Sequence, residues 1–230
     1  MLRVTLACLA GVAVIAIFLA AQGGAMPQKE PSAPAPPALP SLPEFHFAYA
    51  MGPEGKIRQV LVNRDNAQVQ TLDSCTGQDV PQENGLGKLA RQDFNFDGYP
   101  DLTMQVAFDP QTDNSSYCIW LYDPKTQTFV LSDELSHLIN PQPDPSNKTV
   151  VARTKIRCSG SCYVEETYEW SKEHLAPIRE ESLTEDTLVP PWSDCRWVWE
   201  VQKEKNGKLV DINRERVDPG GVMCEPRSAW

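Results

Sequence analysis

Hydrophobic and polar residues alternate along much of the chain after residue 43. The clearest run places Leu102, Met104, Val106 and Phe108 between polar or small neighbours, which is the period of two expected of a half-buried β-strand. The same alternation predicts further strands at 56–62, 68–72, 117–122, 149–156, 163–170, 197–201 and 209–214. Turn sequences such as Asp123-Pro124 and Asn206-Gly207 separate these runs, as expected of antiparallel hairpins.

One segment, 133–139, has a helical pattern, with Ser132 or Asp133 as its cap and Asn140-Pro141 as its stop. Many short strands with almost no helix predict an all-β domain. Antiparallel hairpins of this kind occur in a small propeller-like fold, a sandwich or a barrel, and the pattern leaves these three open.

The N-terminal segment is apolar. Residues 4–21 carry no charge, follow the single cation Arg3, and lead to the small residues Gly23, Gly24 and Ala25. We expect residues 1–25 to be a cleaved signal peptide. The alternative is an N-terminal anchor in the inner membrane, because 18 apolar residues just reach the length of a membrane span. Either alternative predicts a periplasmic or secreted protein.

Proline dominates the next segment. Residues 26–43 contain seven prolines and no apolar periodicity, which is typical of an extended spacer. We therefore divide the chain into the leader at 1–25, the spacer at 26–43 and an all-β domain at 44–230.

Six cysteines follow the leader, and an even number in an exported chain predicts three disulfides. Cys158 and Cys162 flank a Ser-Gly-Ser turn and are the first expected pair. Cys195 with Cys224 would close the last hairpin, which leaves Cys75 with Cys118. These last two pairs are working hypotheses, since six cysteines allow 15 pairings.

The chain is acidic, with 21 Lys and Arg against 31 Asp and Glu and a formal net charge of −10. This balance disfavours binding to nucleic acid or to an anionic membrane surface, so membrane contact is expected only through an uncleaved N-terminal segment. A protein partner is expected to be basic.

Residues 93–101 combine oxygen-bearing side chains with the spacing of a calcium loop. Asp93, Asn95, Asp97 and Asp101 occupy positions one, three, five and nine; Gly98 stands at position six, where the chain turns sharply, and Tyr99 supplies the position-seven carbonyl. Position twelve is methionine instead of the glutamate of an EF-hand. We predict a calcium site at Asp93, Asn95, Asp97, Tyr99 and Asp101; the alternative is a solvated acidic turn.

This loop resembles the calcium loops of FG-GAP or VCBS repeat proteins, whose fold is a β-propeller with structural calcium. Together with the segments 120–126, 138–149 and 167–175, it is similar to a family of exported bacterial proteins with a single FG-GAP-like loop. Some members of that family are periplasmic immunity proteins that inhibit lysozyme-like effectors. The resemblance implies calcium as cofactor and a basic peptidoglycan hydrolase as partner, and it assigns no inhibitory residue.

The sequence has no recognisable catalytic motif: G-x-S-x-G, H-E-x-x-H and the P-loop are all absent. The adjacent Glu165 and Glu166 would face opposite sides of a strand, and so would not share a cleft. We read His46, His137 and His174 as surface or packing residues. A non-catalytic binding module is therefore expected; the alternatives are an envelope enzyme acting on glycans and a surface-tethered structural calcium module.

Overall fold

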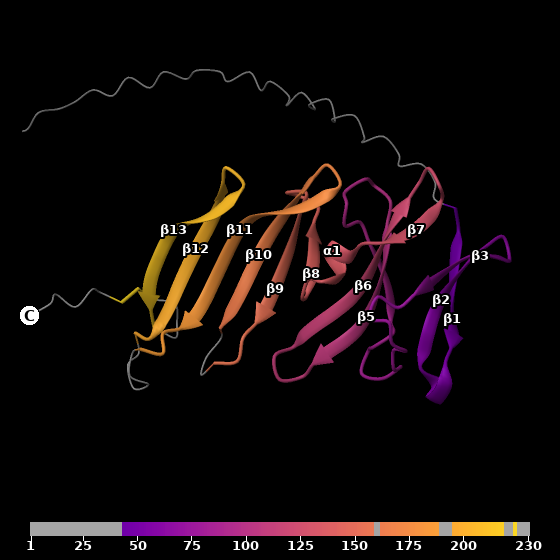
Figure 1. The fold of residues 1–230 in the computed structure, drawn as a ribbon, viewed down its shortest axis with the longest axis horizontal. Coiled ribbons are helices and arrows are strands. Elements are labelled where there is room, and N and C mark those ends of the chain that lie inside the picture. The colour runs from indigo at the N-terminus through magenta and orange to yellow at the C-terminus, as the bar shows by residue number, and fades with distance from the viewer. Residues whose placement is uncertain (1–42, 159–161, 189–194, 219–222, 225–230) are drawn as a thin grey trace, which may run out of the picture. The chain divides into compact units, whose positions relative to one another are not determined.

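A computed structural model describes residues 43–158, 162–188, 195–218 and 223–224. These residues form three antiparallel sheets, each with its strands in chain order (Figure 1). None of the three sheets closes into a barrel within the described residues, and the arrangement is that of an all-β sandwich with one short helix. The all-β prediction is confirmed. The predicted signal peptide, and the spacer up to residue 42, lie outside the described residues.

The first sheet contains three strands, β1 (Phe45–Met51), β2 (Ile57–Arg64) and β3 (Ala67–Asp73). A 3-10 turn, η1 (Pro53–Gly55), lies between β1 and β2. The β2–β3 turn uses Asp65 and Asn66, which both have positive φ. Asn and Asp tolerate this conformation better than other non-glycine residues, so the turn sequence sets the register of the hairpin.

The second sheet contains β4 (Leu89–Gln92), β5 (Asp101–Asp109), β6 (Asn114–Asp123) and β7 (Thr128–Leu131). It shares one hydrophobic core with the first sheet. The core combines Ile57, Val60, Val62 and Leu72 of the first sheet with Leu102, Met104, Trp120, Tyr122 and Phe129 of the second. The strand prediction at Leu102 to Phe108 therefore identified the strand at the centre of the core.

The third sheet contains six strands, which Figure 1 shows side by side from β8 to β13. They are β8 (Pro141–Asp144), β9 (Thr149–Lys155), β10 (Tyr163–Ser171), β11 (His174–Glu185), β12 (Trp197–Lys205) and β13 (Lys208–Val217). A second cluster connects this sheet with the four-stranded one, because Val150 of β9 packs with Phe94, Ile119 and Leu135.

Three hairpin turns share an Asp-Pro sequence, in the connections β5–β6, β6–β7 and β8–β9. In each turn the aspartate accepts a hydrogen bond from the backbone N–H two residues later, and the fifth residue has positive φ. The aspartates are Asp109, Asp123 and Asp144, and the positive-φ residues are Asp113, Gln127 and Lys148. Proline presets the next φ and the aspartate holds the turn, so three hairpins form by one local mechanism.

The helix α1 (Asp133–Ser136) is shorter than the predicted 133–139. Its cap is Ser132, whose side chain accepts a hydrogen bond from the N–H of Leu135. The prediction was wrong at the C-terminal end because Ile139 forms a β-bridge with Ser116 of β6. Pairing with the sheet thus ends the helix before the Asn140-Pro141 stop is reached.

Two asparagines connect the four-stranded and six-stranded sheets. The side chain of Asn114 on β6 donates to the carbonyl of Lys155 and accepts from its N–H, both at 2.9 Å. The side chain of Asn140 accepts from the N–H of Ser115 at 2.8 Å and donates to the carbonyl of Arg153 at 2.9 Å. We call this junction between β6 and β9 the seam.

Another side-chain amide connects the three-stranded sheet with the four-stranded one. Gln70 on β3 donates to the carbonyl of Phe129 on β7 at 2.6 Å and accepts from the N–H of the same residue at 2.9 Å. The amide thus pairs with the backbone of β7 as a neighbouring strand would.

The predicted disulfides are confirmed: Cys75–Cys118, Cys158–Cys162 and Cys195–Cys224. Three bridges indicate a domain that folds in an oxidising compartment, as expected of an exported or periplasmic protein. Among the described residues, no helix is long and apolar enough to span a membrane.

Candidate metal centre

The predicted calcium loop connects β4 to β5 and is anchored by Phe94. The Phe94 side chain is 1% exposed and packs with Ile119, Leu135 and Val150. Its carbonyl accepts a hydrogen bond from the indole N–H of Trp170 on β10 at 2.8 Å. The second residue of the loop is therefore buried between the four-stranded and six-stranded sheets, and this contact fixes where the loop begins.

Hydrogen bonds within the loop bring its polar residues together. The side chain of Asn95 donates to Asp97 Oδ2 at 3.0 Å and accepts from the N–H of Asp97 at 3.2 Å. Asp97 Oδ1 accepts from the N–H of Tyr99 at 2.8 Å. Gly98, at φ 89°, donates its N–H to Asp93 Oδ2 at 2.9 Å. Glycine adopts this φ without the cost of a Cβ, as the motif requires at position six.

Asp93 carries a buried oxygen without a partner. Its Oδ1 is buried and makes no hydrogen bond within the described part of the chain. Burial raises the pKa of Asp93, and the charge of the nearby Asp97 raises it further, while the backbone N–H groups of Gly98, Phe96 and Asp97 act in the opposite direction. A buried, unpaired carboxylate oxygen carries a free-energy penalty that a cation would relieve.

Asp101 is fully buried and connects the loop to β6. Its Oδ2 accepts from the N–H of Phe94 at 2.7 Å, and its Oδ1 accepts from the N–H of Tyr122 at 2.9 Å. Burial, followed by repulsion from Asp93 and Asp97, raises the pKa of Asp101 to about 7. Its neighbours were not predicted, because Tyr122 lies 21 residues away in sequence.

The loop fits a hard cation in part. Asp93 offers a free buried oxygen, and each oxygen of Asp101 accepts one hydrogen bond and so keeps a lone pair. Across the described segments, however, no three His, Cys, Asp or Glu side chains form a group placed to hold a metal ion. The ligand set Asp93, Asn95, Asp97, Tyr99 and Asp101 therefore stays a prediction.

The adjacent glutamates Glu165 and Glu166 and the three histidines make ordinary ion pairs and hydrogen bonds. Glu165 is 3.6 Å from Arg153, whereas Glu166 interacts with Tyr168 on the other face of β10. His46 lies 3.9 Å from Glu44, and His174 lies 3.2 Å from Glu134. The His137 ring is 2.6 Å from the carbonyl of Asp133 at the end of α1. The positions of Glu165 and Glu166 on opposite faces of β10 agree with the expectation that these two glutamates do not share a cleft.

The chain matches no family model and no curated protein. It is similar to a solved structure described as a Xanthomonas type IV secretion system related protein, with a TM-score of 0.50 and 16% sequence identity. The superposition covers 72% of this chain and 85% of that chain. At this identity the similarity concerns the fold alone, and it identifies the all-β architecture as one that occurs in a secretion-related protein.

Proposed function

We propose that this chain is an exported, non-catalytic binding module, stabilised by calcium, that inhibits a lysozyme-like peptidoglycan hydrolase. The observation that carries the proposal is the β4–β5 loop. It holds the motif on which the resemblance to the FG-GAP-like immunity proteins rests, and it contains the unpaired buried oxygen of Asp93. The solved structure to which the chain is similar is described as a type IV secretion system related protein, and this description is compatible with an exported role.

In this proposal the cation has a structural role. Asp93, Asn95, Asp97, the Tyr99 carbonyl and Asp101 would hold it, and the ion would supply positive charge among three carboxylates that repel one another. Because Phe94 and Asp101 connect the loop to the core, calcium would stabilise the whole four-stranded sheet. The residues of the loop would then act through the fold, without touching the partner.

Calcium titration of the chelated protein tests the metal. We expect the melting temperature to rise, because a ligand that binds only the folded state stabilises it by mass action, by about 2.7 kcal/mol at a hundredfold excess over Kd. Asp97→Ala should abolish the rise. Glu83→Gln, which removes an exposed carboxylate outside the loop, should leave it unchanged. An identical melting curve with chelator and with calcium would contradict the calcium site.

Charge supports a basic partner. The formal net charge of −10 would attract a cationic hydrolase over several ångströms and accelerate association. Screening weakens such attraction, since the Debye length falls from about 10 Å at 0.1 M salt to about 3 Å at 1 M. An inhibitor of this kind should therefore associate more slowly as salt rises.

A cell-wall clearing assay tests the inhibition. We expect the domain to slow at least one member of a panel of lysozyme-like muramidases at micromolar concentration, and to clear no cell wall alone. A panel in which no muramidase is slowed would contradict the inhibitor proposal. Clearing by the domain alone would instead support an envelope enzyme.

A further inference from the structure

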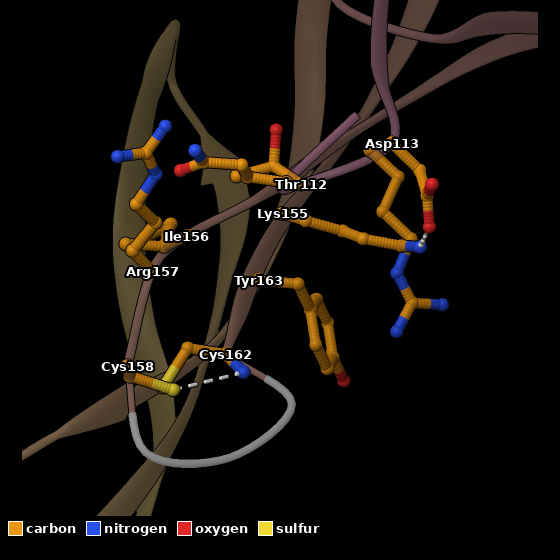
Figure 2. A pocket seen from close by; sticks show the side chains of 10 residues that line it. Thr112, Asp113, Lys155, Ile156, Arg157, Cys158, Cys162 and Tyr163 are labelled. Carbon is orange, nitrogen blue, oxygen red and sulfur yellow. Dashed lines mark hydrogen bonds and ion pairs between the residues drawn. A yellow bond between two sulfur atoms is a disulfide. The ribbon is translucent and has the colours of Figure 1, made fainter. Parts of the chain in front are cut away.

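A pocket of about 430 Å³ opens at the seam, and its lining contains no residue of the β4–β5 loop. Figure 2 shows the side chains that line it. The β5–β6 turn forms one part of its lining through Asp113. The end of β9 contributes Arg153 and Lys155, with Arg157 just beyond it, and the start of β10 contributes Tyr163. We call this cavity the seam pocket. Pockets between packed structural units are frequent ligand sites in proteins.

Three cations line the seam pocket at alternate positions. Arg153 and Lys155 lie on one face of β9, and Arg157 follows at the same spacing. The Cα atoms of alternate residues in an extended strand are about 6.6 Å apart, and the charged ends of Lys155 and Arg157 point to opposite sides of the pocket (Figure 2). In a chain with ten more acidic than basic residues, three cations around one pocket depart from the general surface.

Among the described residues, each cation has one carboxylate partner and retains other donors. Arg153 lies 3.6 Å from Glu165, Lys155 lies 2.7 Å from Asp113, and Arg157 lies 3.4 Å from Asp109. The cationic side chains are half exposed or more. Lysine has three donors and arginine five, so one carboxylate leaves donors on each group for a further oxyanion. Figure 2 shows Lys155 extended toward Asp113.

The lining of the pocket is held in place. Asn114 bonds both backbone groups of Lys155, and Asn140 bonds the carbonyl of Arg153. The Arg153 guanidinium lies 3.9 Å from the centre of the Tyr163 ring, whose hydroxyl donates to Glu181 at 2.7 Å. A disulfide joins Cys158 to Cys162 beside the pocket. Such preorganisation reduces the entropy lost when a ligand binds.

We propose that the seam pocket binds a small ligand that carries two or more carboxylate or phosphate groups. Arg153, Lys155 and Arg157 contact the anionic groups, and the ring of Tyr163 forms an apolar side of the site. The formal net charge of the chain is negative, so recognition depends on these local contacts rather than on long-range attraction. The site is independent of the calcium loop and of hydrolase inhibition.

Calorimetric titration at fixed ionic strength tests the proposal with three probes. Adipate carries two carboxylates, fructose 1,6-bisphosphate carries two phosphates, and acetate carries one carboxylate. We expect adipate or the bisphosphate to bind at least tenfold more tightly than acetate, and the stronger of the two identifies the ligand chemistry. Equal binding of all three probes would overturn the proposal. So would the absence of binding by both adipate and the bisphosphate.

Variants locate the site. Lys155→Gln and Arg157→Gln should each weaken binding of the preferred probe about tenfold, which corresponds to about 1.4 kcal/mol. Lys203→Gln is the matched control, because Lys203 is exposed on β12 and outside the pocket. Its affinity should stay within twofold of the unmodified protein. A loss equal to that of the pocket variants would overturn the assignment.

Asp113→Asn separates ligand binding from a structural role of the ion pair. Asp113 competes with an anionic ligand for Lys155, so its neutralisation should tighten binding of the preferred probe. If the pair between Lys155 and Asp113 serves only to hold the seam together, the same variant should leave binding unchanged or weaken it. Either of those results would contradict the proposal.

Discussion

The hairpins β5–β6 and β10–β11 differ in how they are stabilised. Five of the nine residues of β5 are buried, and β6 contributes Cys118, Ile119 and Trp120 to the interior. In β10 and β11 no residue is fully buried. Strands of similar length in one chain thus depend on different forces. The four-stranded sheet depends on apolar burial, whereas the outer part of the six-stranded sheet depends on contacts that leave its side chains half exposed.

The six-stranded sheet has covalent and ionic contacts at its strands β9 to β13 and their ends. Two of the three disulfides, Cys158–Cys162 and Cys195–Cys224, lie at its strand ends. Ion pairs join strands of this sheet or their ends: Arg153–Glu165, Arg196–Glu185, Arg214–Glu200 and Arg216–Asp186. In three of these pairs the arginine is about half exposed or more, and such pairs contribute little each, about 0 to 1 kcal/mol; the Arg196–Glu185 pair is more buried. We therefore expect the disulfides to carry more of the stability of this region than the ion pairs do.

The largest loss in the free energy of unfolding should come from a substitution in the four-stranded sheet. Leu102 is 0% exposed, and Leu102→Ala should lower the free energy of unfolding by about 3 to 4 kcal/mol, because it removes buried methyl groups and leaves a cavity. Leu183→Ala, on half-buried β11, should cost about 1 to 2 kcal/mol, since less apolar surface returns to water. Urea denaturation measures both. Equal losses would contradict the comparison.

Removal of the Cys195–Cys224 disulfide should lower the free energy of unfolding by a somewhat smaller amount. The double substitution Cys195→Ala with Cys224→Ala opens a link across 29 residues and should cost about 2 to 3 kcal/mol. Hydrogen exchange should accelerate in β12 and β13 and stay unchanged in β5. Uniform acceleration in all three strands would show that the two regions unfold as one unit.

The smallest change in stability should come from the glutamate pair Glu166 and Glu180. Glu166 and Glu180 face each other across β10 and β11, and burial followed by the charges of Glu166 and Glu200 raises the pKa of Glu180. A raised pKa means that the folded state holds this proton more strongly than the unfolded chain. The associated stability is complete below the unfolded pKa and declines as pH rises through the folded pKa.

Glu180→Gln should therefore stabilise the protein at pH 7, by about 0.5 kcal/mol from removal of a like-charge cross-strand pair. The gain should disappear near pH 3.5, where the glutamate is protonated in both states. Thermal melting at the two pH values measures it. The control is Glu173→Gln in the exposed β10–β11 turn, which should change stability at neither pH. A gain that persists in acid would point to a cause other than charge.

The sequence predicted most of the long strands because apolar and polar residues alternate along them, although β5 is buried on both faces from Asp101 to Met104 and its Phe108 is exposed. It did not predict β1, β4, β7, β8 or β11, and β11 is the longest strand among the described residues. The two prolines of β8, Pro141 and Pro143, argue against a strand in a sequence pattern, yet β8 is an edge strand, where proline is tolerated. Strands β4 and β7 have four residues each, too few to establish a period.

The candidate calcium loop and the seam pocket also differ in how far the sequence could predict them. The spacing of Asp93 to Asp101 is local, so the sequence named the residues of the loop in advance. The contact between Asp101 and Tyr122, by contrast, depends on how β5 and β6 pair. The seam pocket combines a turn before β6 with the end of β9. The cations Arg153, Lys155 and Arg157 were not singled out from the sequence, because nothing local indicates that the β5–β6 turn completes a cavity around them.

The Gln70 amide has a consequence for solubility. An edge strand with free backbone groups can recruit a strand from another molecule and begin aggregation. At Phe129 both backbone groups are already bonded to Gln70, so an incoming chain would have to displace that side chain before it could pair there. One glutamine on a neighbouring sheet thus protects β7 from intermolecular pairing while leaving Val130 beside it exposed to solvent.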